Sequence, residues 1–167
     1  MKKKYFLIII SLAISLFIYL FYRTEKTVVT DLFISLISLD RYVGLKEIIV
    51  NNVILNEHII NSLPEGLWVF CITLTSKNLF LKVGDKEISL LFLPLLFSIG
   101  LEFFQLFKLT NGRFDFWDIG FSIAFWAIAN YLMKYKNTRQ NILCPFNIDS
   151  LICIFSYLII YLAHVWE

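Results

Sequence analysis

The sequence predicts an all-α fold, a polytopic membrane helix bundle with about five transmembrane helices. The first observation behind this prediction is composition: the chain has 167 residues, 59% of them hydrophobic and 17% charged. Soluble domains contain about 45–50% apolar and about 25% charged residues. The second is that the apolar residues are gathered into long runs, with a mean hydropathy of +0.73. A soluble domain of this size would expose too much Phe, Leu and Ile to stay in solution, so we expect a single membrane domain over residues 1–167.

Five apolar runs approach the length of about 20 residues that a helix needs to cross a bilayer. They cover residues 5–22, 63–81, 88–107, 116–133 and 150–166. The first run follows three lysines and resembles a signal peptide, but no small-residue cleavage site follows it. We therefore predict that it is an uncleaved transmembrane helix.

The segment 23–62 is amphiphilic and contains no apolar window of spanning length. It is interrupted by Asp40 and Arg41, and again by Asn51 and Asn52. We predict two short helices lying on the membrane surface, at about residues 27–39 and 45–60. This segment would form an outer amphiphilic loop.

The distribution of Lys and Arg predicts the orientation of the chain. An N-terminus inside the cell puts the larger share of the basic residues on the cytoplasmic side, as membrane proteins prefer. Five spans then place the C-terminus outside. We expect a multi-pass protein of the cell membrane.

Polar residues interrupt the third and fourth apolar runs where the two runs face each other. Glu102 and Gln105 lie near the end of the third run, and Asp115 and Asp118 open the fourth. The connection is short, so the two helices should be antiparallel neighbours whose polar faces meet near the outer interface. Arg113 is placed to pair with Glu102 or Asp118. Charged groups in apolar helices are costly and usually functional.

These five residues allow a structural and a functional interpretation. An Arg–carboxylate cluster can simply fix how two helices pack. However, three carboxylates and one Arg leave a surplus of negative charge, which favours a site that also binds a head group, a cation or a substrate. The candidate ligand-binding residues are therefore Glu102, Gln105, Arg113, Asp115 and Asp118. We expect no metal site, because Arg113 competes for the carboxylates and the cysteines and histidines have no metal-binding spacing, and we expect no cofactor.

The same residues resemble the VanZ-like family of small bacterial membrane proteins. The family pattern reads here as Glu102-Phe-Phe-Gln105, then Gly112-Arg113, then Asp115-Phe-Trp-Asp118. Residues 63–70, LPEGLWVF, also resemble an element found in a branch of the family. The sequence departs from the pattern at Ser122, where many members have Asn. The resemblance implies a helical protein of the bacterial cytoplasmic membrane with a role in the cell envelope and in glycopeptide-antibiotic resistance.

Three functions remain open from the sequence. The leading one is binding of a polar envelope component, such as a lipid or polymer head group, with an effect on antibiotic susceptibility. The second is an enzyme that acts on a lipid-linked substrate with a carboxylate as general base; no nucleophile–base motif identifies catalytic residues. The third is an accessory subunit of a membrane complex. Its partner would be another membrane protein or further copies of the same chain. The net charge of +2, without a clustered basic face, argues against binding of nucleic acid.

Overall fold

The computed structural model describes residues 2–23, 28–110, 113–132, 139–143 and 148–165. Over these residues the chain is mostly helical, as predicted. The helices and strands, in chain order, are α1 (Lys2–Phe21), α2 (Val28–Ile37), α3 (Leu39–Asn52), α4 (Glu57–Ser76), β1 (Leu79–Val83), β2 (Lys86–Ser89), α5 (Leu93–Leu106), α6 (Phe116–Leu132), β3 (Gln140–Asn141) and α7 (Ile148–Val165). Each of the five apolar runs thus contains a long helix.

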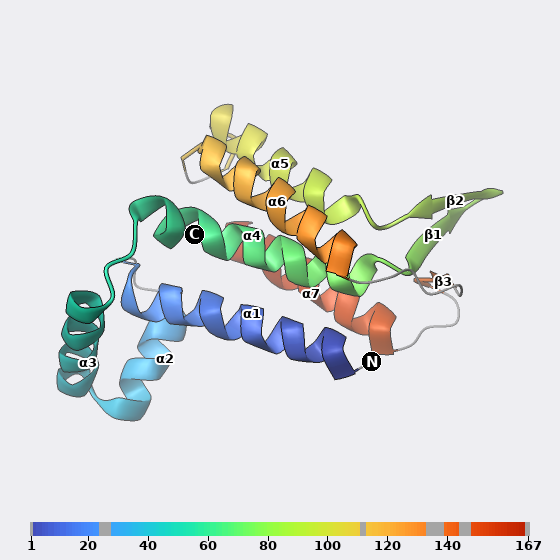
Figure 1. The fold of residues 1–167 in the computed structure, drawn as a ribbon. Helices are drawn as coiled ribbons and strands as arrows, with labels where there is room; N and C mark the ends of the chain where they lie inside the picture. The colour runs from blue at the N-terminus through green and yellow to red at the C-terminus, as the bar shows by residue number, and fades with distance from the viewer. Residues whose placement is uncertain (1, 24–27, 111–112, 133–138, 144–147, 166–167) are drawn as a thin grey trace.

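Helix α4 is the central helix of the bundle (Figure 1). It packs against α6, α1, α7 and α5, and all its residues from 69 to 76 are buried. The helix begins at Glu57, earlier than the predicted start at residue 63, because Asn56 caps it: the Asn56 side chain accepts a hydrogen bond from the His58 N–H. Pro64 therefore lies inside the helix and not in its first turn.

Of the long helices α1, α4, α5, α6 and α7, each runs in the direction opposite to the one before it in the chain, so the bundle has two distinct ends. At one end α1 and α7 both begin, where the Tyr5 hydroxyl donates to Asp149 Oδ1 at 2.8 Å and Lys4 Nζ lies 3.3 Å from the same oxygen. At the other end α1 and α5 finish while α4 and α6 begin. There Arg23 Nη2 donates to the Asn61 carbonyl at 3.0 Å. We call this second end the acidic end, because the carboxylates described below lie there.

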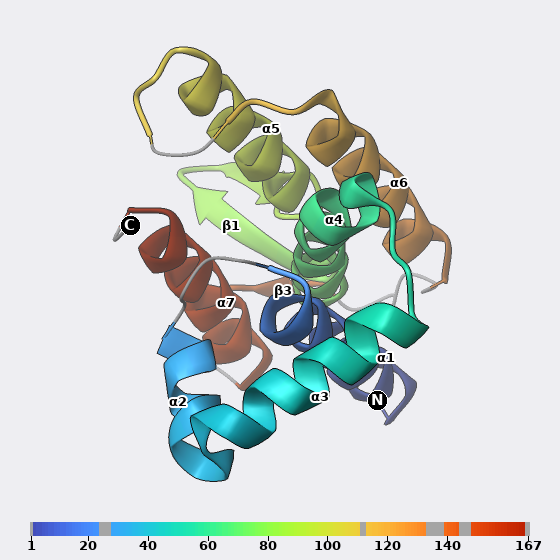
Figure 2. The same ribbon diagram turned by 90° about the vertical axis from the view of Figure 1, so that its left-hand side faces the viewer.

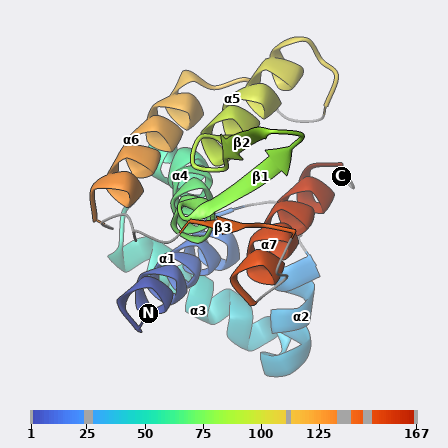
Figure 3. The ribbon, with the colours of Figure 1, turned by 90° about the vertical axis from the view of Figure 1, so that its right-hand side faces the viewer.

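A small sheet accompanies the helices, and it shortens the helix predicted at 88–107. Strands β1 and β2 form an antiparallel hairpin, and β3 adds parallel to β1 in the order β2-β1-β3, at the end of the bundle opposite α2 and α3 (Figure 3). The turn between the strands holds Gly84 with a φ of +62°, a conformation that suits glycine and hairpin turns. The apolar residues that follow extend the hydrophobic run without extending the helix, so α5 begins only at Leu93.

Helices α2 and α3 lie across the acidic end of the bundle (Figure 2). Two short helices were predicted in this loop, but their boundary was wrong: the break falls at Ser38, whose φ is +75°. The second helix therefore covers Leu39–Asn52, and residues 57–60 belong to α4. Tyr42 holds α3 to α1, since its ring stacks with Phe21 and its hydroxyl donates to the buried Leu20 carbonyl at 2.6 Å.

We expect Tyr42→Phe to destabilise the protein by about 1–2 kcal/mol, because it leaves the buried Leu20 carbonyl without its donor. Burial also raises the pKa of Tyr42, so the hydroxyl remains a donor well above neutral pH. Tyr22→Phe is the matched control. Its hydroxyl donates to the Val53 carbonyl at 2.7 Å in an exposed setting, where water can replace it, and a change below about 0.5 kcal/mol is expected. Thermal unfolding in detergent measures both; equal effects would show that the α1–α3 junction is not a buried contact.

Only one of the helices in the described part of the chain, Lys3–Phe21, is both long and apolar enough to qualify as a membrane span. Helices α5 and the described portion of α7 are apolar but shorter. Large apolar side chains are nevertheless exposed on several helices, among them Phe6 and Ile9 on α1, Leu96 on α5 and Phe116 on α6, all more than 60% exposed. The surface of the bundle is thus apolar well beyond the one qualifying helix.

Candidate functional site

Glu102 caps the start of α6 from the neighbouring helix. Its side chain is only 3% exposed, and Oε2 accepts a hydrogen bond from the Asp115 N–H at 3.0 Å. Asp115 is the N-cap of α6, because its Oδ1 accepts from the Trp117 N–H at 2.9 Å. In a capping box, the side chain three residues after the N-cap would bond the N-cap N–H. Here that residue is Asp118, and Glu102 takes its place.

A chain of hydrogen bonds joins α4, α5 and α6 behind this cap. Ser98 and Ser122 are fully buried, and their hydroxyl oxygens lie 2.7 Å apart. The Ser98 hydroxyl also donates to Glu65 Oε1 at 2.9 Å, while the Trp68 indole N–H donates to Glu65 Oε2 at 2.6 Å. The polar faces predicted for the third and fourth runs therefore do meet, and Glu65 brings a third helix into the same network.

Asp118 is the member of the cluster that the local structure leaves without a complete set of partners. Its Oδ1 is buried and accepts no hydrogen bond. The Ser62 hydroxyl on α4 is also fully buried and lies next to the Asp118 carboxyl group, but the two do not form a hydrogen bond of ordinary geometry. Because Glu102 already bonds the Asp115 N–H, Asp118 is released from capping and faces α4.

The cation of the cluster is Arg23, at the end of α1, and not Arg113. The Arg23 guanidinium interacts electrostatically with both Glu65 and Asp118 and stacks over the Tyr19 ring at 4.4 Å. Arg113 is exposed, and among the described residues no hydrogen bond or ion pair joins it to Glu102, Asp115 or Asp118. The expected Arg113–carboxylate pair is therefore not formed.

Gln105 lies one turn beyond Glu102 and is half-buried near the end of α5. Its backbone carbonyl accepts from the Lys108 N–H at 2.9 Å. No hydrogen bond joins its side chain to Glu65, Glu102 or Asp118 within the described ranges. The structure thus brings together Glu102, Asp115 and Asp118 of the five predicted residues, while Gln105 and Arg113 lie beside them.

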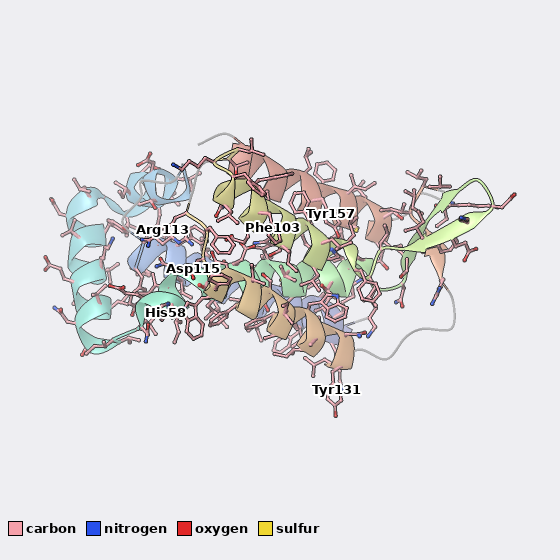
Figure 4. The ribbon with its side chains drawn as sticks, turned by 90° about the horizontal axis from the view of Figure 1, so that it is seen from above. His58, Phe103, Arg113, Asp115, Tyr131 and Tyr157 are labelled. Carbon is pink, nitrogen blue, oxygen red and sulfur yellow. The ribbon has the colours of Figure 1, made fainter. Side chains whose placement is uncertain are left out.

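An aromatic pair lies at the rim of the acidic end. The rings of His58 on α4 and Trp117 on α6 lie 4.7 Å apart with an interplanar angle of 31°. In Figure 4, His58 and Asp115 lie at one end of the bundle and Tyr131 lies far from them on α6. Trp117 is about half exposed, so the rim of the acidic end is apolar and aromatic while its interior is polar.

Arg23, Ser62 and Glu65 were not among the predicted site residues. Glu65 carries a signal that the sequence offers, a carboxylate within the apolar run that follows Pro64. Arg23 carries no such signal, because it ends an apolar helix where a flanking basic residue is ordinary. In the described part of the chain, no group of three or more His, Cys, Asp and Glu side chains is arranged to hold a metal ion.

Comparison with known proteins finds no relative of this chain. No protein-family model matches the chain, no curated protein matches its sequence and no solved structure matches its fold.

Proposed function

We propose that this chain is a VanZ-like membrane protein of the bacterial cell envelope that binds the polar head group of an envelope lipid or polymer at its acidic end. Binding there would alter susceptibility to glycopeptide antibiotics. The segments that resemble the family pattern supply the cluster: Glu102 caps Asp115, and Asp118 lies one turn further on. Glu65, within the second resembling segment, joins the same network through Ser98.

In this proposal α1, α4, α5, α6 and α7 cross the bacterial cytoplasmic membrane, with the N-terminus inside and the C-terminus outside. The alternating direction of α1, α4, α5, α6 and α7 along the chain and the exposed apolar side chains on α1, α5 and α6 support it. The acidic end then faces outward, and α2 and α3 lie at the outer interface. Glu102 lies four residues before the end of α5 at Leu106, which is about 6 Å of helix, so an outer head group has a short distance to descend to reach it.

The observation that carries the proposal is the buried, unpartnered Oδ1 of Asp118. A buried polar atom without a partner costs about 1–3 kcal/mol, and structural capping accounts for Glu102 and Asp115 but not for Asp118. The neighbouring Ser62 hydroxyl does not supply the missing hydrogen bond to Oδ1. A polar group from outside the chain would complete it.

Asp118→Asn tests the proposal because it keeps the shape of the side chain and removes its charge. Cells that express the wild-type protein should differ from empty-vector cells in glycopeptide susceptibility, and Asp118→Asn should return them to the empty-vector level. Glu87→Gln, an exposed substitution in β2 far from the acidic end, should behave as wild type. Membrane abundance must be matched for all three. Wild-type behaviour of Asp118→Asn would remove the acidic end from the function.

A further inference from the structure

Among the buried polar atoms without a hydrogen-bond partner at the acidic end, three come from segments that are far apart in the chain. They are Arg23 Nε after α1, Ser62 Oγ on α4 and Asp118 Oδ1 on α6. Asp118 connects them, since its carboxyl group lies against the Ser62 hydroxyl and interacts electrostatically with the Arg23 guanidinium. Arg23 also bonds the carbonyl of Asn61, the residue before Ser62, so a donor, an acceptor and a hydroxyl occur close together in this part of the acidic end.

The positions of these atoms are held by contacts that do not use them. Arg23 is fixed through Nη2, which donates to the Asn61 carbonyl, and through stacking on Tyr19, so Nε–H remains available. The Ser62 side chain has no exposed surface, so its hydroxyl can form hydrogen bonds only with groups inside the acidic end. These contacts restrict how the Arg23 and Ser62 side chains can move, which lowers the ordering cost of binding a ligand.

The charge of the site indicates the sign of its ligand. Glu102 is repelled by Glu65, Asp115 and Asp118 together, while Arg23 is the guanidinium that acts on Glu65 and Asp118. Carboxylates therefore outnumber the guanidinium, and a cationic group would relieve the repulsion. The carboxylates do not converge as metal ligands among the described residues, which favours a hydrogen-bonding organic cation over a metal ion.

We infer that the head group bound at the acidic end carries a primary ammonium group close to an anionic group, as in an ethanolamine phosphate. This inference rests on the proposed function and names the chemical class of its ligand. The ammonium group donates to Asp118 Oδ1 and to Ser62 Oγ, and the anionic group accepts from Arg23 Nε–H. A quaternary ammonium group cannot donate these hydrogen bonds, and an uncharged glycerol group does not neutralise Asp118.

The experiment compares three short-chain lipids on the full-length protein in detergent: phosphatidylethanolamine, phosphatidylcholine and phosphatidylglycerol. Native mass spectrometry or calorimetry measures binding. Phosphatidylethanolamine should bind at least about tenfold more tightly than the other two, which corresponds to about 1.4 kcal/mol. Ser62→Ala and Asp118→Asn should each remove this preference. Glu87→Gln, which lies far from the site in β2, should keep it.

The outcomes separate this inference from the function on which it rests. Equal or tighter binding of phosphatidylglycerol overturns the ammonium assignment and leaves head-group binding intact. An unchanged preference in both Ser62→Ala and Asp118→Asn overturns the assigned contacts. If none of the three lipids binds, the ammonium assignment is overturned. If, in addition, cells with Asp118→Asn show the antibiotic susceptibility of wild type, the proposed function is overturned as well. If a variant does not fold, the comparison of the three lipids on the wild-type protein still decides the chemical class.

Discussion

Replacement of Gly66 by alanine is expected to destabilise the folded protein by about 2–3 kcal/mol, the usual cost of forcing an extra methyl group into a packed interior. A Cβ atom at this position would lie 2.6 Å from Phe125 Cδ2 and 3.2 Å from both the Cβ and the carbonyl oxygen of Phe121. The carbonyl belongs to the backbone of α6, so it cannot move without the helix. Phe125 also packs against the buried core that contains Phe70, so its displacement disturbs the centre of the bundle.

Gly120→Ala is the matched control, because Gly120 lies on α6 and nothing lies within 4 Å of a Cβ placed there. Alanine is the better helix former by about 0.8–1 kcal/mol, so this variant should be as stable as wild type or more stable. Thermal unfolding in detergent, followed by intrinsic fluorescence, measures both variants. Equal stability of Gly66→Ala and Gly120→Ala would show that α4 and α6 do not approach each other as closely as described.

The long helices could be predicted because their signals are local. Helix α6 covers Phe116–Leu132, close to the predicted run at 116–133, and its N-cap follows from Asp115 and the turn before it. The meeting of Glu102 with Asp115 was also predictable, since a short connection forces neighbouring helices to be antiparallel. These parts of the site depend on residues that are near each other in the chain.

The remaining parts of the site depend on contacts between distant segments. Arg23 reaches Asp118 only because α1 and α6 both pack on α4, and no periodicity within α1 indicates this. Arg113 lies next to the cluster in sequence and was the natural partner on that basis, yet its side chain is exposed. Proximity in the chain therefore predicted the carboxylates correctly and the cation wrongly.

The β-hairpin was missed because hydropathy does not distinguish a strand from the start of a helix. The apolar residues from Ile88 to Phe92 extend the run that becomes α5, although β2 ends at Ser89 and α5 begins at Leu93. The turn at Gly84 and Asp85, with strand-forming residues before it, was the available signal. The break at Ser38 had no such signal, because Ser is not a residue that commonly adopts a positive φ.

Arg23→Ala is expected to destabilise the protein by about 1.5–3 kcal/mol, the range for leaving buried charged groups without their partner. The substitution removes the bond from Nη2 to the Asn61 carbonyl and the stacking on Tyr19. It also leaves Glu65 and Asp118 without the guanidinium that acts on both. Arg23→Lys should recover only part of the loss, because an ammonium group keeps the charge but lacks the planar, forked donors of guanidinium.

Arg113→Ala is the control that separates the structure from the expectation of the sequence. Because Arg113 is exposed and makes no ion pair with the carboxylates of the described cluster, its removal should change stability by less than about 0.5 kcal/mol. The double variant Arg23→Ala/Asp118→Asn should lose less stability than the sum of the losses of the two single variants. The reason is that the Asp118 charge is then removed together with the Arg23 charge that compensates it. Thermal unfolding of wild type, Arg23→Ala, Asp118→Asn and the double variant gives the coupling energy between Arg23 and Asp118. If Arg113→Ala costs more stability than Arg23→Ala, then Arg113 is the cation of the site, as the sequence first indicated. If the effects of Arg23→Ala and Asp118→Asn are additive, then α1 does not contribute to the acidic end.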